Sequence, residues 1–185
     1  MSKITVAVLV GSLRKESYNR RLAKALEKLL PEGWRFDYLR IDDLPLYNQD
    51  FDQDYPAEGT RLKQAVEAAD ALLVVTPEYN RSFPGVLKNA LDIGSRPWGT
   101  NSFNGKPGAA LGASPGAPGT SMAQQHLRNV LLYLGVRLMG VPEAYVQFKE
   151  DRIDAEGNIL HDDTRKFLQD YVDKFVAWVG QCRKA

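Results

Sequence analysis

The segment from Ala71 to Asp92, ALLVVTPEYNRSFPGVLKNALD, constrains the fold more than any other part of the chain. Its first six residues are nearly all apolar and do not alternate with polar residues, which is typical of a strand buried on both faces of a parallel sheet. Pro77 ends this strand because it has no N–H to donate, and Pro84-Gly85 begin a helix. In an open α/β sheet, ligands bind in the loops after the carboxyl ends of the strands. The sequence therefore predicts a ligand site in the loop between the two prolines.

Strand-like and helix-like segments alternate five times along the chain. Apolar runs predict strands, and apolar residues three or four positions apart predict helices. Strands are expected at Ile4–Val10, Trp34–Ile41, Ala71–Thr76, Pro107–Ala113 and Gly135–Met139, and helices at Tyr18–Leu30, Thr60–Ala69, Pro84–Ser95, Ser121–Leu134 and Phe167–Cys182. This alternation predicts an α/β fold, a doubly wound, five-stranded parallel sheet with helices on both faces. The short chain favours the flavodoxin-like strand order 2-1-3-4-5, in a single domain that covers residues 1–185.

Composition and charge argue against several classes of function. The net charge of the 185-residue chain is +1, which produces no field that would attract nucleic acid or an anionic membrane. The single cysteine, Cys182, excludes an internal disulfide and a cysteine-based metal cluster, and it suits a reducing compartment. The first apolar run is too short for a membrane span and lacks a signal-peptide cleavage pattern. We expect a cytoplasmic protein with neither a nucleic-acid nor a membrane partner.

The loop after the first strand, GSLRKESYNR, has the composition of an anion site. It is neither a G-x-G-x-x-G motif nor a P-loop, so a dinucleotide or a Mg-bound triphosphate is not indicated. It offers three neutral donors and one cation close to a helix N-terminus, where free N–H groups and the helix dipole bind anions: Ser12, Ser17, Asn19 and Arg14. The helix also begins with arginines instead of the acidic residues that helices prefer there. The positive end of the helix dipole repels these cations, and a bound phosphate would offset that repulsion. The alternative is that the arginines are solvated and Ser17 only caps the helix.

The other two loops suit a flat conjugated ring. The loop PEYNRS offers Tyr79 as an apolar platform and several backbone amides around Asn80 and Ser82. The loop SPGAPG, from Ser114 to Gly119, has almost no side chains, so its backbone can approach a planar ligand closely. Each loop by itself is equally compatible with an ordinary turn. Because all three loops follow parallel strands, we expect them to open at the same edge of the sheet.

Together these motifs resemble the NADPH-dependent FMN reductase family, and especially its chromate- and quinone-reducing branch. The similarity extends from Ile4 to about Tyr145, and P-E-Y-N-x-S-x-P-G-x-L-K-N-A-x-D is a long and specific signature. The resemblance implies that FMN is the cofactor and that its phosphate is held by Ser12, Arg14, Ser17 and Asn19. It implies that the isoalloxazine is lined by Pro77, Glu78, Tyr79, Asn80 and Ser82, and that its pyrimidine edge meets Ser114 and Gly116. It also implies a homodimer or homotetramer with each flavin near a subunit interface.

The activity implied by this resemblance is NAD(P)H-dependent reduction of quinones, and promiscuously of chromate, azo dyes or free flavin. FMN would accept hydride from the nicotinamide and then pass electrons to the acceptor at the same site, which predicts ping-pong kinetics. No catalytic side chain is expected, because the sequence shows neither a Ser-His-Asp set nor paired catalytic carboxylates nor a metal-ligand cluster. The two histidines, His126 and His161, are expected to be structural or solvated. No motif that recognises a ribose distinguishes NADH from NADPH.

Several positions keep two interpretations. Arg81 and Arg96 are either contacts for an anionic substrate or surface arginines, and the acidic segment from Asp42 to Gly59 either covers the flavin or packs on a partner subunit. For the whole chain, the competing hypotheses are a flavodoxin-type electron carrier and a flavin-free regulatory domain. A carrier is disfavoured by the net charge of +1, because carriers usually dock through a large acidic excess. Its phosphate loop would also be rich in hydroxyl groups, whereas this one relies on arginine.

Overall fold

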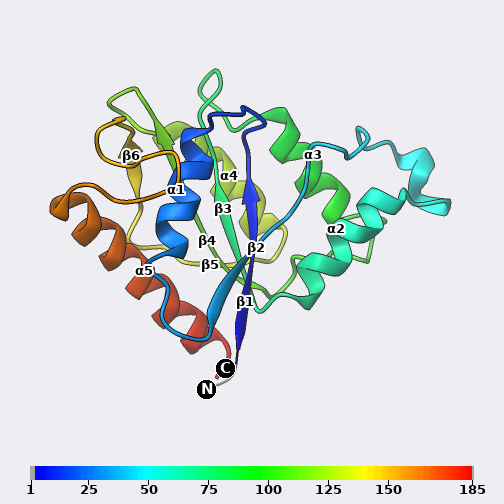
Figure 1. Cartoon of the computed structure of the whole chain (residues 1–185). Helices are drawn as coiled ribbons and strands as arrows, with labels where there is room; N and C mark the ends of the chain where they lie inside the picture. The colour runs from blue at the N-terminus through cyan, green and yellow to red at the C-terminus, as the bar shows by residue number, and fades with distance from the viewer. Residues whose placement is uncertain (1–2, 185) are drawn as a thin grey trace.

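The computed structural model describes residues 3–184 and arranges them around one parallel sheet (Figure 1). Its strands are β1 (Ile4–Val10), β2 (Trp34–Tyr38), β3 (Ala71–Val75), β4 (Pro107–Ser114), β5 (Arg137–Leu138) and β6 (Tyr145–Gln147). Its α-helices are α1 (Tyr18–Glu27), α2 (Ala57–Ala68), α3 (Gly85–Gly94), α4 (Ser121–Tyr133) and α5 (Asp162–Cys182), and Gln49–Gln53 form a short 3₁₀ helix. The strand order β2-β1-β3-β4-β5 confirms the flavodoxin-like prediction, including the edge position of β2.

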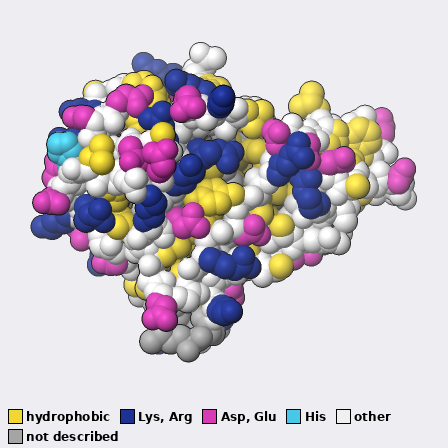
Figure 2. Space-filling view, viewed as in Figure 1, with side chains coloured by type: hydrophobic (Ala, Val, Ile, Leu, Met, Phe, Trp, Pro, Cys, Tyr) yellow, Lys and Arg dark blue, Asp and Glu magenta, His cyan; other side chains and the backbone are white. Residues whose placement is uncertain are grey.

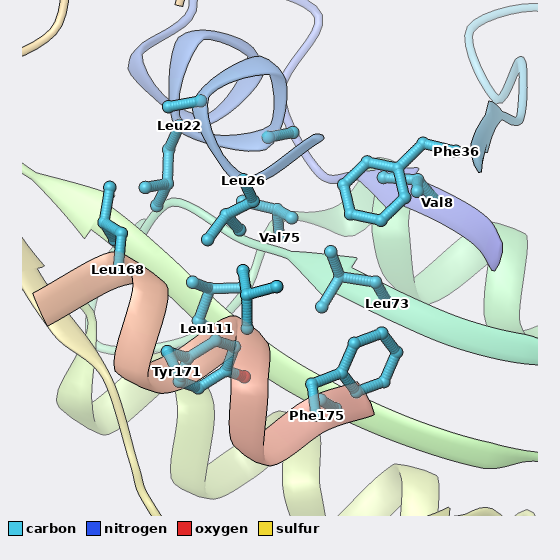
Figure 3. Close-up of a cluster of buried hydrophobic side chains, with 14 of the residues drawn as sticks. Val8, Leu22, Leu26, Phe36, Leu73, Val75, Leu111, Leu168, Tyr171 and Phe175 are labelled. Atoms are coloured by element: carbon cyan, nitrogen blue, oxygen red, sulfur yellow. The ribbon is translucent and has the colours of Figure 1, made fainter. Parts of the chain in front are cut away.

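Helices cover both faces of the sheet, which explains why its strands are almost continuously apolar. Successive residues of a strand point to opposite faces, so Val8 packs toward α1 and α5, whereas Leu9 packs toward α2, α3 and α4. Figure 3 shows the first of these two cores, where Leu26 of α1 lies close to Val75 of β3 and Phe175 of α5 lies close to Leu73 of the same strand. Among the described residues, no helix combines the length and apolarity that crossing a membrane requires.

The structure differs from the expected elements mainly at the β4 edge. The beginning of β4 pairs with β5, which is only two residues long, and its end pairs with β6 through Gly112↔Tyr145 and Ser114↔Gln147. The sequence prediction missed β6 because three residues are too few to show a strand pattern. Helix α5 begins at Asp162, five residues before the expected Phe167, since two aspartates in its first turn interact favourably with the helix dipole.

Candidate functional site

A cavity of about 170 Å³ is lined by residues from all three loops that the sequence analysis selected. It lies at the carboxyl ends of β1, β3 and β4, so the expected meeting of the loops at one sheet edge is observed. Eight of the candidate residues line it: Ser12, Arg14, Ser17, Asn19, Pro77, Glu78, Tyr79 and Ser114. The lining also includes three residues that the sequence analysis did not select, Tyr18, Ala113 and Pro115. Asn80, Ser82 and Gly116 belong to the same loops but are not part of this lining.

The start of α1 presents hydrogen-bond donors to this cavity. Ser17 caps the helix, and its Oγ accepts a hydrogen bond of 3.2 Å from the backbone N of Arg20. The other first-turn amides have no acceptor within the helix and point toward its N-terminal end. The Arg14 guanidinium lies 4.8 Å from the ring centre of Tyr18, and that ring stacks on Phe148 at 4.3 Å. A cation and free amides therefore face the same end of the cavity.

Asn19 has a structural role that its place in the motif did not reveal. Its side chain is buried, and both ends of its amide bind Ala113 of β4: Nδ2 donates to the carbonyl oxygen and Oδ1 accepts from the backbone N, each at 2.9 Å. The side chain thus joins the start of α1 to the end of β4. A contact between Asn19 and a phosphate stays a prediction, and it would have to share an amide that is already bound at both ends.

The two arginines at the start of α1 do not line the cavity. Arg21 forms ion pairs with Glu16 at 3.0 Å and with Glu150 at 2.6 Å, so two carboxylates offset its charge. Arg20 is exposed and lines a different cavity, next to β2. Of the charged residues in the first motif, Arg14 is the one in position to meet an anion in the three-loop cavity.

The second loop is a tight hairpin that projects beyond the sheet at the top of Figure 1. Tyr79 and Ser82 exchange two backbone hydrogen bonds, of 2.8 and 3.0 Å. The two residues between them, Asn80 and Arg81, have φ values of 52° and 66°, which correspond to the type I′ geometry of two-residue hairpins. Non-glycine residues seldom adopt positive φ, and such strain is concentrated at functional sites. The hairpin leaves Tyr79 53% exposed at the rim of the cavity.

Three side-chain contacts hold this hairpin against α4. Glu78 Oε2 accepts hydrogen bonds of 3.1 Å from the backbone N atoms of Met122 and Ala123, in the favourable field at the helix N-terminus. Arg81 Nη1 contacts the Met122 sulfur at 2.7 Å, and Ser82 Oγ lies 3.1 Å from Nδ1 of His126. The Glu78 side chain is thus already bound to the start of α4. The contact of Ser82 with His126 agrees with the expected structural role of His126, but the sequence did not indicate its partner, which lies 44 positions away.

The third loop brings backbone into the site without bulky side chains. Ser114 Oγ accepts a 3.2 Å hydrogen bond from the backbone N of Gly116, and Gln147 of β6 donates to the Pro115 carbonyl oxygen at 3.2 Å. A Cβ atom on Gly112 would lie 1.9 Å from the carbonyl oxygen of Thr76. The strand that leads into the loop therefore needs glycine at position 112, beside Thr76, the residue that follows β3.

Arg96 and the acidic segment 42–59, whose roles the sequence left open, lie outside this cavity. Arg96 stacks over Trp98, with 5.3 Å between the guanidinium carbon and the ring centre, and lines a separate cavity with Tyr133. In the acidic segment, the Tyr47 hydroxyl donates to Asp52 at 3.2 Å and the Tyr47 backbone N donates to Asn89 Oδ1 at 2.8 Å. Within residues 3–184, no group of three or more histidine, cysteine or acidic side chains is arranged to hold a metal ion.

The donor set of the cavity fits FMN. A phosphate needs a cation and free N–H groups, which Arg14 and the start of α1 provide. A flat ring needs an apolar platform and close backbone approach, which Tyr79 and the Ser114–Gly116 turn provide. The cavity of about 170 Å³ is smaller than most ligand pockets, so much of a bound ring would stay accessible from outside.

Comparison with known proteins agrees with this geometry. The family model for NADPH-dependent FMN reductase matches residues 4–151. The chain belongs to this family. The match confirms the predicted class of protein, an oxidoreductase that uses FMN as cofactor and NAD(P)H as electron donor.

Named relatives cover nearly the whole chain. A 2-hydroxy-1,4-benzoquinone reductase of a Burkholderia species is 56% identical over 180 residues, which are 97% of this chain and 98% of the relative. A quinone reductase of Escherichia coli is 36% identical, with 98% of each chain covered. Among solved structures, FerB of Paracoccus denitrificans, a flavoenzyme NAD(P)H:(acceptor) oxidoreductase, superposes with a TM-score of 0.93 at 49% identity, covering 96% of this chain and 98% of its own.

Proposed function

We propose that this protein is an FMN-dependent quinone reductase in which the three-loop cavity holds the flavin and NAD(P)H is the electron donor. The observation that supports this proposal most directly is that three motifs spread over about 100 residues of sequence line one cavity at the sheet edge. The relatives named as quinone reductases support the choice of acceptor.

The loop at the start of α1 binds the FMN phosphate in this proposal. Arg14 supplies the charge, and Ser12, Ser17 and the free amides of the first helical turn supply neutral donors. Asn19 contributes by holding the end of β4 in place through its two bonds to Ala113. The phosphate is thus fixed at the junction of α1 and β4.

The two other loops bind the ring. Pro77, Tyr79 and the turn that begins at Ser114 line it, while Asn80 and Ser82 set the shape of the hairpin and Gly116 shapes the turn. Bound FMN supplies the redox chemistry, because flavins accept hydride from nicotinamides and reduce acceptors such as quinones. Because the cavity is small, one face of a bound ring would stay accessible. Donor and acceptor can then use that face in turn, without an acid or base from the protein.

The finer expectations concern acceptors, assembly and location. An open ring face also suits chromate, azo dyes and free flavin as promiscuous acceptors. A homodimer or homotetramer of single-domain chains is supported by exposed apolar side chains that follow α3 and end α4, with Trp98 77% and Tyr133 75% exposed. The cytoplasm is the expected location, because the thiol-poor sequence suits a reducing compartment.

The test is steady-state kinetics on the purified protein. We expect a yellow protein that retains FMN and oxidises NAD(P)H with 1,4-benzoquinone as acceptor. Double-reciprocal plots at several fixed quinone concentrations should be parallel, as for ping-pong turnover at one site. A protein that takes up no FMN would contradict the cofactor site. Intersecting lines would contradict a shared site for the two substrates.

A further inference from the structure

A second cavity opens at the same end of the sheet, on the side away from the hairpin. It has a volume of about 390 Å³ and lies between the carboxyl ends of β1 and β2 and the first turn of α1. Its lining combines apolar side chains, an aromatic ring and a charged rim: Val8, Val10, Leu13, Tyr38, Leu39 and Ile41, then Arg20, Arg40 and Asp42. This volume is within the range of small-molecule sites, and the combination of apolar lining with a few charged groups is typical of them.

This cavity and the three-loop cavity are separated by a single loop. Ser12 and Arg14 line the three-loop cavity, whereas Leu13 lines the second one. Neighbouring strands of a sheet are about 4.8 Å apart. The two cavities lie over strands in the order β2-β1-β3-β4, so their centres are on the order of 10 Å apart. An extended dinucleotide is long enough to place one end in each.

Arg20 contributes an uncompensated positive charge to the rim. It lies on the first turn of α1, it is exposed, and within residues 3–184 its guanidinium has neither a carboxylate nor a hydrogen-bond partner. Tyr38, which also lines this cavity, donates its hydroxyl to Glu27 at 2.9 Å. Burial raises the pKa of Tyr38 above its usual value, so this ring stays neutral and adds no negative charge to the cavity. In Figure 2, Lys and Arg side chains border exposed hydrophobic surface in the region of α1 and β1.

Asp42 is the one acidic residue in the lining, and its oxygens are already bound. Arg40 donates from Nε to one carboxylate oxygen at 2.9 Å and from Nη2 to the other at 3.5 Å, while its Nη1 lies 3.4 Å from Asp43. A carboxylate at the end of the second strand recognises a ribose diol in other α/β folds, and an arginine there recognises a 2′-phosphate. Here the carboxylate is occupied by Arg40 and the free group is Arg20.

We propose that the cavity between β1, β2 and α1 binds the adenosine 2′-phosphate end of NADPH, with Arg20 as the residue that selects NADPH over NADH. The apolar side chains and Tyr38 accept the adenine, and the guanidinium groups of Arg20 and Arg40 face the 2′-phosphate. The nicotinamide then reaches the flavin in the neighbouring cavity. The orientation of the dinucleotide rests on the proposed function, whereas recognition of the phosphorylated adenosine does not.

The experiment is isothermal titration calorimetry with adenosine 2′,5′-bisphosphate and with adenosine 5′-monophosphate, on the full chain before and after loading with FMN. We expect the bisphosphate to bind about tenfold more tightly, as one charge-assisted contact provides. Arg20→Ala should reduce this ratio at least fivefold. Arg35→Ala, which removes an exposed arginine of β2 that does not line the cavity, should leave the ratio unchanged. Asp42→Asn should increase the ratio, because it removes a negative charge and one of the two acidic partners of Arg40.

Kinetic constants give an independent readout. Arg20→Ala should lower kcat/KM for NADPH about tenfold and leave kcat/KM for NADH unchanged. Equal affinity of the wild-type protein for the two nucleotides, or a ratio that Arg20→Ala does not change, would overturn the inference. If the protein binds no FMN but binds the bisphosphate through Arg20, the proposed function fails and this inference stands. If FMN binds and both nicotinamides are oxidised equally well, this inference alone fails.

Discussion

Polar groups at the amino end of the parallel sheet, such as Asp70 and Lys106, are paired within the protein, whereas two arginines at the carboxyl end have no acidic partner in the described part of the chain. At the amino end, Asp70 accepts a 2.8 Å hydrogen bond from the backbone N of Thr5 and pairs with Arg183. There Lys106 Nζ also donates to two carbonyl oxygens at the end of α2, at 2.8 and 2.5 Å. At the carboxyl end, Arg14 and Arg20 are exposed and, within residues 3–184, neither pairs with a carboxylate.

This difference separates stability from binding within one sheet. Polar groups whose hydrogen bonds are made within the protein contribute to the free energy of unfolding and have no donor or acceptor left for a ligand. Free amides at a helix start, unpaired guanidinium groups and backbone with positive φ contribute little to stability, but they are available to an anion or a ring. Substitutions at the two ends should therefore affect different measurements.

Asn19→Ala is expected to have the largest effect on the free energy of unfolding. It is an exception to the comparison, because Asn19 lies at the carboxyl end and yet both ends of its amide are hydrogen-bonded within the protein. Its loss leaves the buried N–H and C=O of Ala113 without their partner, which should lower the free energy of unfolding by about 3 kcal/mol. Urea denaturation measures this change. Asn129→Ala, at an exposed position of α4, is the matched control and should cost less than about 1 kcal/mol. Equal costs for the two variants would contradict the role assigned to Asn19.

Arg14→Ala should weaken FMN binding and leave the fold intact. Removal of one charge-assisted contact to a phosphate costs about 2 kcal/mol, or roughly thirtyfold in Kd. Fluorescence titration of the apoprotein with FMN measures the affinity, and the melting temperature of the same apoprotein should change by less than about 2 °C. Arg35→Ala removes a charge outside both cavities and serves as the control. Unchanged FMN retention in Arg14→Ala would refute the phosphate assignment.

Asp70→Ala, at the amino end, should lower stability and leave FMN binding unchanged, which is the opposite of the result expected for Arg14→Ala. It leaves the Thr5 N–H without its side-chain acceptor and removes the partner of Arg183, which should lower the free energy of unfolding by about 1–2 kcal/mol. FMN affinity should not change, because the substitution lies at the far end of the sheet. A loss of FMN affinity comparable to that of Arg14→Ala would mean that the two ends are not independent.

Asp43→Asn should have the smallest effect on the free energy of unfolding, and this effect should depend on pH in a defined way. Hydrogen bonds of 2.7 and 2.8 Å from Arg61 lower the pKa of Asp43 to about 2. A lowered pKa stabilises the fold above the unfolded-state value of about 3.9 and loses that contribution as the pH falls toward 2. Asp43→Asn should therefore lower the free energy of unfolding by less than about 1 kcal/mol at pH 7. The difference in unfolding free energy between the variant and the wild type should become smaller below pH 4. Urea denaturation at pH 7, 5 and 3.5 measures this difference, and a difference that grows on acidification would contradict the ion pair between Asp43 and Arg61.

Much of the fold followed from local patterns, and the errors follow from long-range contacts. The uninterrupted apolar run of β3 and the breaks at Pro77 and Pro84 were sufficient to place a strand, a loop and a helix. By contrast, β6 is three residues long and exists because Gln147 and its neighbours pair with the end of β4. Contacts of this kind leave no periodic signal in the sequence.

The candidate site divides in the same way. Motif residues such as Arg14 and Tyr79 were selected from sequence, and they line one cavity. The sequence did not distinguish Arg20 from Arg21, although Arg21 is paired with two glutamates and Arg20 lines another cavity. Charge type is visible in a sequence, whereas the partner that offsets it comes from another element of the fold.

The sequence by itself determined the alternating α/β order, the three loops at strand ends and the family to which their motifs point, because these depend on residue type and spacing along the chain. Only the tertiary structure decided which donors remain free. It bound Asn19 to Ala113, directed Glu78 to the start of α4 and left Arg20 without a partner in the part of the chain that is described. The reason is geometric: hydrogen bonds and ion pairs act over a few ångströms, so only folding decides which polar groups satisfy each other and which stay available to a ligand.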